Sequence, residues 1–273
     1  MRKWVRGPAV GEGLRRAGSL PADLEAPAKL TLSLRITGVR PDGYHLIDAE
    51  MVSVDLADRL ELAPGDGLAV VGGAGSSVPL GPDNLVRRAL QAAGRRASVR
   101  LHKRIPAGAG LGGGSADAAA VLRWAGVLDV NVAVRLGADV PFCLFGGRAR
   151  VEGVGEVLSP LPFAVVDGQA YTLLTPPMAV STAAVYRAWD DLGGPTGPGG
   201  NDLEPAALAV EPALAIWRDR LGDATGETPR LAGSGGTWFV PGSFPGAGRL
   251  VVRATAPSGR RRPEGRRPEA GRP

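Results

Sequence analysis

A glycine-rich run places the strongest constraint on how this chain folds. It reads IPAGAGLGGGSADAAAV from Ile105 to Val121, with five glycines within seven residues. Glycine adopts backbone angles that other residues avoid and lets neighbouring groups approach closely, so the run predicts a tight loop. Gly108, Gly110 and Gly113 have the G-x-G-x-x-G spacing of a dinucleotide-binding turn, but the same run could wrap the phosphates of a nucleoside triphosphate in another fold.

The residues around the run argue against the two commonest glycine motifs. In ASVRLHKRIP, Val99 and Leu101 alternate with polar residues, so only one face of the predicted strand can be buried. The first strand of a dinucleotide-binding fold is buried on both faces and reads as a continuous apolar run. The motif GxxxxGK[ST] requires a lysine where this chain has Gly114 followed by Ser115. Neither motif fits.

The residues after the run predict a helix. We expect Ser115 to cap it, Asp117 to lie in its first turn and Gly126 to end it. The free amides at the N-terminus of such a helix form a site for anions. Loop and helix together therefore predict a place for phosphate groups.

The rest of the chain mixes strand and helix patterns, which predicts an α+β protein. An apparent antiparallel meander precedes the glycine run. Strands are expected in KLTLSLRITG, AEMVSVDLADRLELAPGDG, GLAVVGGAG, ASVRLHKRIP, FCLF, RARVEGV, YTLLTPP and GRLVVRATAP. Helices are expected in PDNLVRRALQAAG with Asp83 or Asn84 as cap and Gly94 as stop, in STAAVYRAWDDL capped by Ser181, and in NDLEPAALAVEPALAIWRDRLG with a break near Pro212. RLAGSGGTWFVPG predicts a second glycine-rich turn between apolar segments.

Composition excludes several classes of protein. The chain has 273 residues, 44% of them hydrophobic, which is enough for a substantial core. No apolar run approaches the roughly 18 residues of a membrane span, so we expect a cytoplasmic protein. One cysteine and two histidines argue against a disulfide framework or a structural zinc. The net charge of +5 comes from the ends, since residues 1–20 and 254–273 each carry +4 and the rest −3, which disfavours a specific nucleic-acid partner.

Three sets of motifs, in this order along the chain, resemble the GHMP kinases. PAKLTLSLRITGVRPDGYH from Pro27 to His45 resembles the family's first motif, and IPAGAGLGGGSADAAA resembles its phosphate loop. LGADVPFCLFGG, NDLEPAAL and LAGSGGTWF complete a match that covers residues 26–254. The segments DGYH and LGADVPF are the most specific, and they are most similar to the members that act on a cytidylyl-linked methylerythritol. Other members, of the mevalonate or homoserine type, and an inactive relative remain as alternatives, as does a nucleic-acid-binding protein that uses the basic ends.

The resemblance implies a fold and an activity. The fold would have two α+β domains, the first like ribosomal protein S5 domain 2 and the second ferredoxin-like, with the active site between them. The activity would be phosphorylation of an alcohol in a small-molecule substrate, with ATP and Mg²⁺ as cofactors, no membrane partner, and a monomeric or homodimeric chain. We expect a flexible extension over 1–25, an ATP-binding domain over 26–166, a shortened second domain over 167–254 and a disordered tail over 255–273.

The resemblance also implies roles for single residues. Lys29 and Asp139 would be the reacting pair, with Asp139 aligning the acceptor hydroxyl and taking its proton. The ATP-binding residues would be Asn84, Lys103, Pro106, Ala107, Gly108, Ala109, Gly110, Leu111, Gly112, Gly113, Gly114, Ser115 and Ala116, with Ser115 near Mg²⁺. The substrate-binding residues would be Thr31, Tyr44, His45, Asp139, Tyr186, Gly233, Ser234 and Gly235, with Tyr44, His45 and Tyr186 around the cytosine.

The sequence departs from the family pattern in a few places. Thr31 stands where the family commonly has asparagine, which replaces a two-ended amide by a hydroxyl. The segment RWAGVLDVNVAVRLGADV is shorter than expected by about one helix, and no helix is predicted between TWFVPG and the last strand. The first twenty-five residues are additional. We expect the missing helices to reduce the buried apolar surface and hence the stability.

Overall fold

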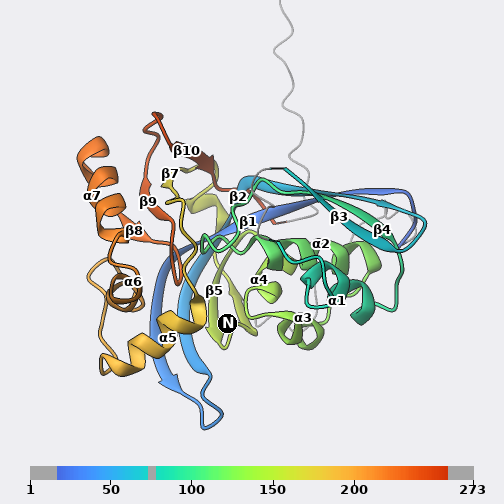
Figure 1. Ribbon diagram of the computed structural model, residues 1–273, viewed down its shortest axis with the longest axis horizontal. Helices are drawn as coiled ribbons and strands as arrows, with labels where there is room; N and C mark the ends of the chain where they lie inside the picture. The colour runs from blue at the N-terminus through green and yellow to red at the C-terminus, as the bar shows by residue number, and fades with distance from the viewer. Residues whose placement is uncertain (1–16, 73–77, 258–273) are drawn as a thin grey trace, which may run out of the picture.

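The fold is built on one long antiparallel hairpin that runs through the whole molecule (Figure 1). The computed structural model describes residues 17–72 and 78–257. The hairpin consists of β1 (Ala22–Val39) and β2 (His45–Ala63). Helices α1 to α4, within residues 85–145, lie on one side of it, and helices α5 to α7, within residues 182–225, lie on the other. Most of the expected extension (1–25) and tail (255–273) lies outside the described residues. Ala22–Glu25 belong to β1 and pair with β2, so this part of the expected flexible extension is wrong.

The first sheet forms around β2, which has a partner along each of its two edges. β1 pairs with one edge along nearly its whole length, and β4 and β5 share the other edge. β3 pairs with β4 in parallel, so the expected meander is wrong at this point, because helix α1 carries the chain across between these two strands. The remaining strands are β3 (Gly67–Val71), β4 (Ser98–His102), β5 (Arg148–Gly153) and β6 (Val157–Pro160).

β1 differs from the half-buried strand that its alternating pattern predicts. It begins at Ala22, and its middle residues are buried on both faces, including Lys29 and Thr31 at 4% and 1% exposure. Leu34 packs in the larger core with the helices, whereas Leu30 packs in a second core that also contains residues of the second sheet. The polar side chain of Lys29 is covered because Gly112 of the phosphate loop and Gly233 of the second glycine-rich turn lie against it.

Four helices cover the first sheet, and one of them, α2, begins differently from the prediction. They are α1 (Leu85–Ala92), α2 (Gly113–Ala125), α3 (Val130–Leu136) and α4 (Val140–Phe145). Asn84 caps α1 and Gly126 ends α2, as predicted. Ser115 does not cap α2, because the N-cap is Gly112, in a left-handed conformation, three residues before Ser115. Asp117 therefore lies beyond the first turn.

The segment FCLF is helical, and its prediction as a strand is wrong. Pro141 lies at the start of α4, a position where its missing N–H costs nothing. α4 packs on α2 and β1, so its apolar residues are buried by a helix and a strand rather than by pairing in a sheet. A short run of apolar residues does not distinguish these two outcomes.

The second sheet has four antiparallel strands in the order β10-β7-β9-β8. The strands are β7 (Ala170–Leu174), β8 (Arg230–Leu231), β9 (Trp238–Pro241) and β10 (Arg249–Arg253), and the helices are α5 (Thr182–Asp191), α6 (Glu204–Val210) and α7 (Leu214–Thr225). The cap at Ser181 and the break near Pro212 are confirmed. The chain passes from β9 to β10 without a helix, and the seven residues of α3 fill the shortened segment before α4. The predicted α+β class is confirmed, and no helix among the described residues is long and apolar enough to cross a bilayer.

Arg123 joins the helix after the phosphate loop to the short helix α4. Its guanidinium donates from Nη1 to the carbonyl of Cys143, at 2.5 Å, and from Nη2 to the carbonyl of Glu25, at 3.3 Å. A cation at the C-terminal carbonyls of a helix is favourable, and charge-assisted bonds are stronger than neutral ones. Arg123 therefore fixes the position of α4, and with it that of Asp139, which directly precedes the helix.

We expect Arg123→Met to destabilise the protein, because it leaves carbonyl groups of α4 and β1 without their donor. The expected loss is about 1–3 kcal/mol of unfolding free energy, measured by urea denaturation. Arg100→Met, at an exposed position of β4, is the matched control and should cost less than about 0.5 kcal/mol. Equal losses in the two variants would contradict the role of Arg123.

Candidate active site

One large cleft gathers most of the residues that the sequence singles out. Its volume is about 900 Å³, and its walls come from β1, the phosphate loop, the start of α4, helix α5 and the second glycine-rich turn. This is the size range of pockets that enclose small ligands. Ala116 and Gly235 are buried outside its lining, whereas the predicted residues that line it are Lys29, Thr31, Tyr44, His45, Asn84, Lys103, Pro106, Ala107, Gly108, Ala109, Gly110, Leu111, Gly112, Gly113, Gly114, Ser115, Asp139, Tyr186, Gly233 and Ser234.

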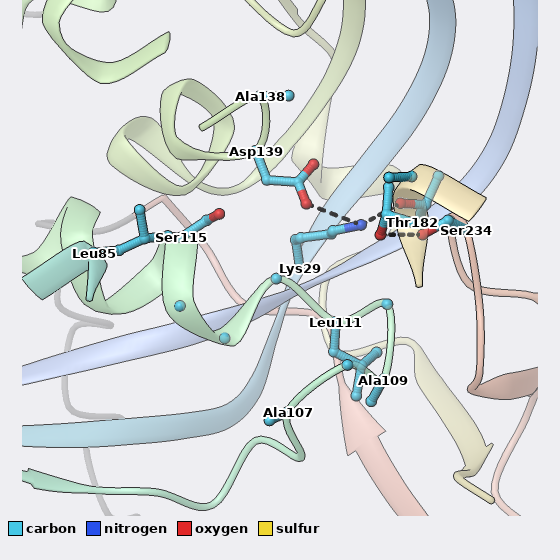
Figure 2. Close-up of a pocket in the computed structure, with 18 of the residues that line it drawn as sticks. Lys29, Leu85, Ala107, Ala109, Leu111, Ser115, Ala138, Asp139, Thr182 and Ser234 are labelled. Carbon is cyan, nitrogen blue, oxygen red and sulfur yellow. Dashed lines mark hydrogen bonds and ion pairs between the residues drawn. The ribbon is translucent and has the colours of Figure 1, made fainter. Parts of the chain in front are cut away.

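The predicted pair Lys29 and Asp139 is brought together in this cleft. The Nζ atom of Lys29 lies 3.4 Å from Oδ2 of Asp139, and Figure 2 shows the two side chains pointing toward each other. The Lys29 side chain is almost fully buried, but 31% of the Asp139 side chain is exposed. Asp139 precedes α4 without a side-chain capping bond, so its carboxylate is directed to the cleft and not used by the helix.

Thr31 orients the ammonium group of Lys29. Its Oγ1 accepts a hydrogen bond from Nζ at 3.0 Å, and both side chains are buried on the same strand. The hydroxyl that replaces the usual asparagine thus has a partner inside the protein. Thr31 and Asp139 together orient the Lys29 ammonium group, which has little access to water.

The glycines of the phosphate loop allow the loop to pack closely on the rest of the protein. Gly108, Gly110 and Gly112 all have φ between +68° and +75°. A Cβ atom on Gly110 would lie 2.2 Å from the carbonyl oxygen of Ala232, and one on Gly112 would lie 2.8 Å from Cγ of Lys29. The loop therefore needs glycine both for its backbone angles and for its contacts with the protein itself.

Alanine at Gly110 should therefore be far more costly than alanine at Gly114. The first variant combines a left-handed backbone with a steric clash, whereas a Cβ at Gly114 would meet only a methyl group of Leu85 at 3.4 Å within a helix. We expect Gly110→Ala to lower the free energy of unfolding by about 1–3 kcal/mol or more. Gly114→Ala should change it by no more than about 1 kcal/mol. Thermal unfolding of both variants measures the difference, and similar melting temperatures would refute this explanation.

Lys103 belongs to a buried group of three charges beneath the loop. Its Nζ pairs with Oδ2 of Asp58 and, at 3.0 Å, with Oδ2 of Asp117, and all three side chains are at most 3% exposed. Asp58 also accepts hydrogen bonds from the backbone amides of Arg104 and Ile105. Lys103 lines the cleft, as expected for a residue near the nucleotide, but its charge is already matched by two carboxylates. Sequence reasoning missed Asp58 because it lies in an ordinary alternating strand.

Asp117 is the carboxylate of this group whose hydrogen bonds are incomplete. Its Oδ1 atom is buried without a hydrogen-bond partner. Burial raises the pKa of Asp117 to about 7, and the neighbouring Asp58 adds to the rise, while Lys103 opposes it. One ammonium group thus supports one ionised carboxylate well and the second one poorly.

The stability of the protein should depend on pH through Asp117. Because its pKa is higher in the folded chain than the ordinary 3.8, its contribution to stability is fully present below pH 4 and is lost as the pH rises to about 7. Asp117→Asn removes this titration, so the stability of the variant relative to the wild type should increase from pH 5 to pH 8. Urea denaturation at both values measures it, and a constant difference would contradict the assignment.

Aromatic side chains line the other end of the cleft. The ring of His45 lies 4.7 Å from that of Tyr186 and 5.5 Å from that of Trp189, and its Nε2 lies 2.8 Å from Oδ1 of Asp190. Burial raises the pKa of the Tyr186 hydroxyl. Tyr44 is 63% exposed at the rim. Trp189 and Asp190 were not predicted as contacts of His45, although their spacing of three and four residues from Tyr186 places them on the same face of α5.

The remaining predicted residues lie on turns at the edge of the cleft. Asn84 caps α1 through the amide of Val86, at 2.8 Å. Ser234 bonds to Thr182 of α5, at 2.8 Å (Figure 2). A Cβ on Gly233 would lie 3.1 Å from Nζ of Lys29, so the second glycine-rich turn lies against the Lys29 ammonium group.

Comparison with known proteins identifies the family. The family model for the GHMP kinases N terminal domain matches residues 84–147. A protein of Paracoccus denitrificans, 4-diphosphocytidyl-2-C-methyl-D-erythritol kinase, is 40% identical over an alignment of 235 positions that covers 78% of this chain and 84% of the relative. The chain belongs to this family of GHMP kinases.

Other relatives and solved structures agree with this assignment. The kinase of the same name from Ruegeria pomeroyi is 39% identical over an alignment of 251 positions that covers 82% of this chain and 88% of the relative. A crystal structure of 4-(cytidine 5'-diphospho)-2C-methyl-D-erythritol kinase superposes with a TM-score of 0.63 at 36% identity, over 80% of this chain and 89% of that chain. The mevalonate kinase of Methanococcus jannaschii, with a TM-score of 0.53 and 12% identity over 86% and 98% of the chains, shares the fold. The predicted two-domain GHMP kinase fold is thereby confirmed.

Proposed function

We propose that this chain transfers the γ-phosphoryl group of ATP to the 2-hydroxyl of 4-diphosphocytidyl-2-C-methyl-D-erythritol, a step in the synthesis of isoprenoid precursors. The family membership supports the reaction class and the substrate. The observation that carries the proposal is the contact of 3.4 Å between Lys29 and Asp139, in a cleft bounded by both glycine-rich turns.

The geometry suits phosphoryl transfer through a loose transition state, in which positioning and charge stabilisation matter most. Asp139 aligns the acceptor hydroxyl and accepts its proton as the new oxygen–phosphorus bond forms. The bond between the γ-phosphorus and the bridging oxygen breaks, and ADP leaves with the electron pair. Lys29 stabilises the negative charge on the transferred group and on the acceptor oxygen.

The phosphate loop supplies the donor side of the site. The backbone amides of the loop and the first amides of the 13-residue helix α2 are available to the phosphates of ATP. Lys103 contributes to this side as the centre of a buried ionic group that supports the loop. We propose that it acts on the loop rather than as a free cation for the nucleotide.

The aromatic end of the cleft supplies the acceptor side. His45 and Tyr186 offer ring faces and edges to a planar base, and Tyr44 at the rim can close over it. Asp190 receives the Nε2–H of His45, which leaves the other ring nitrogen for the base. These residues suit the cytosine of the proposed substrate better than the small acceptors of the mevalonate and homoserine kinases.

This site suits Mg²⁺ that is bound together with the phosphates of ATP. Mg²⁺ is generally held by one or two protein groups together with substrate phosphates, where it neutralises charge on the phosphate oxygens. Within residues 17–72 and 78–257 no group of three or more acidic, histidine or cysteine side chains gathers as a cage. Ser115 lines the cleft next to the loop, and we propose that its hydroxyl contributes to holding the ion. A cytoplasmic location and a monomeric or homodimeric state remain predictions.

Substitution of the reacting pair tests the proposed function. Lys29→Met and Asp139→Asn should each lower the kcat for the cytidylyl acceptor by about 100-fold or more, because each removes charge needed in the transition state. ATP consumption and the phosphorylated product are measured with the cytidylyl acceptor, with mevalonate and with homoserine. Asp219→Asn, an exposed carboxylate of α7, is the matched control and should retain wild-type turnover. Near-native rates in both test variants, or faster turnover of mevalonate or homoserine, would refute the proposal.

A further inference from the structure

Asn201 uses its whole side chain to hold the second glycine-rich turn. It is 2% exposed and lies just before α6. Its Nδ2 donates to the carbonyls of Leu231, at 2.9 Å, and of Gly233, at 2.6 Å, while its Oδ1 accepts from the amide of Leu203 at 3.0 Å. Only an amide side chain offers two donors and an acceptor in this arrangement.

The two carbonyls lie on either side of Ala232, in the part of the turn that touches both halves of the active site. The carbonyl oxygen of Ala232 fits against Gly110 of the phosphate loop, where a Cβ atom would come within 2.2 Å. Gly233 faces the Lys29 ammonium, where a Cβ atom would come within 3.1 Å. The position of this turn therefore sets how closely the loop and the ammonium group lie together.

Asn201 is itself anchored to the strand that carries Lys29. The amide of Leu34 donates to the carbonyl of Gly200 and the amide of Asp202 donates to the carbonyl of Leu34, both at 2.9 Å. The carboxylate of Asp202 accepts from Arg35, at 2.5 Å, and from the amide of Ile36, at 3.0 Å. These bonds attach the segment to β1 beyond Lys29 and Thr31.

We propose that Asn201 is a positioning residue for phosphoryl transfer. It connects the turn at Ala232 and Gly233 to β1 and so fixes the position of the phosphate loop relative to Lys29. It is buried and does not line the cleft. This inference rests on the proposed function for its kinetic consequence, but not for its structural one. A displacement of about 1 Å at a reacting group can cost about 100-fold in rate.

The test compares Asn201→Ala and Asn201→Asp with a control of equal destabilisation. Both variants lose the amide donors, and the aspartate keeps the size of the side chain. Leu221→Ala, at a fully buried position of α7, removes core packing but none of the hydrogen bonds that Asn201 makes to the turn. With the cytidylyl acceptor we expect kcat to fall about 10- to 100-fold in both Asn201 variants, with the KM for ATP within about threefold of wild type. Leu221→Ala should keep a near wild-type kcat at a temperature where all variants are folded.

Hydrogen exchange of the substrate-free protein separates failure of this inference from failure of the proposed function. Exchange of the amides in residues 231–237, measured by mass spectrometry, should be faster in both Asn201 variants and unchanged in Leu221→Ala. If the wild type does not phosphorylate the cytidylyl acceptor, the proposed function fails, and faster exchange would still support the anchoring role. Wild-type exchange in the Asn201 variants, or a wild-type kcat in an active enzyme, would overturn the inference.

Discussion

The contact between the two glycine-rich turns is the constraint on which the active site depends. Gly110 lies directly against the carbonyl of Ala232. Any other residue would place its Cβ atom only 2.2 Å from that carbonyl oxygen. The amide of Thr237 also donates to the carbonyl of Ala109, at 3.2 Å, and the amide of Lys29 to that of Leu111, at 3.1 Å. The loop is thus hydrogen-bonded both to the turn of the second sheet and to β1 of the first. A ligand that binds between these elements meets a site that is already assembled.

Two buried lysines have different partners, and this difference separates their roles. Lys29 has one carboxylate, partly exposed in the cleft, and a hydroxyl. Lys103 has two carboxylates, both buried, and its group carries one negative charge in excess when both are ionised. Burial of an unpaired charge is costly, and burial raises the pKa of Asp117 to about 7. Lys29 remains the cation whose charge can act on a ligand, while Lys103 is committed to the protein.

The sequence predicts the local structure well where a single physical cause decides it. Asn84 and Ser181 cap their helices because their side chains supply the acceptor that a first turn needs, and Pro212 interrupts a helix because it has no N–H. It fails where contacts remote in sequence decide. FCLF is helical because α2 and β1 bury it, and Lys29 is buried because two loops cover an apparently exposed face. The proximity of Lys29 and Asp139 was predicted by family resemblance, since no local pattern links residues 110 positions apart.

The same distinction explains why Asn201 and Asp58 escaped prediction. Both have polar side chains in segments with ordinary patterns, and each is directed at backbone groups far away in the chain: Asn201 at Leu231 and Gly233, and Asp58 at Arg104 and Ile105. A buried polar side chain must satisfy its hydrogen bonds, and loops supply backbone groups that no strand or helix uses. Residues of this kind hold the two glycine-rich segments from behind, whereas the residues that face the cleft remain available for ligands. The proposed reacting pair can therefore be recognised from a motif, but the residues that hold it in place are recognised only from the folded chain.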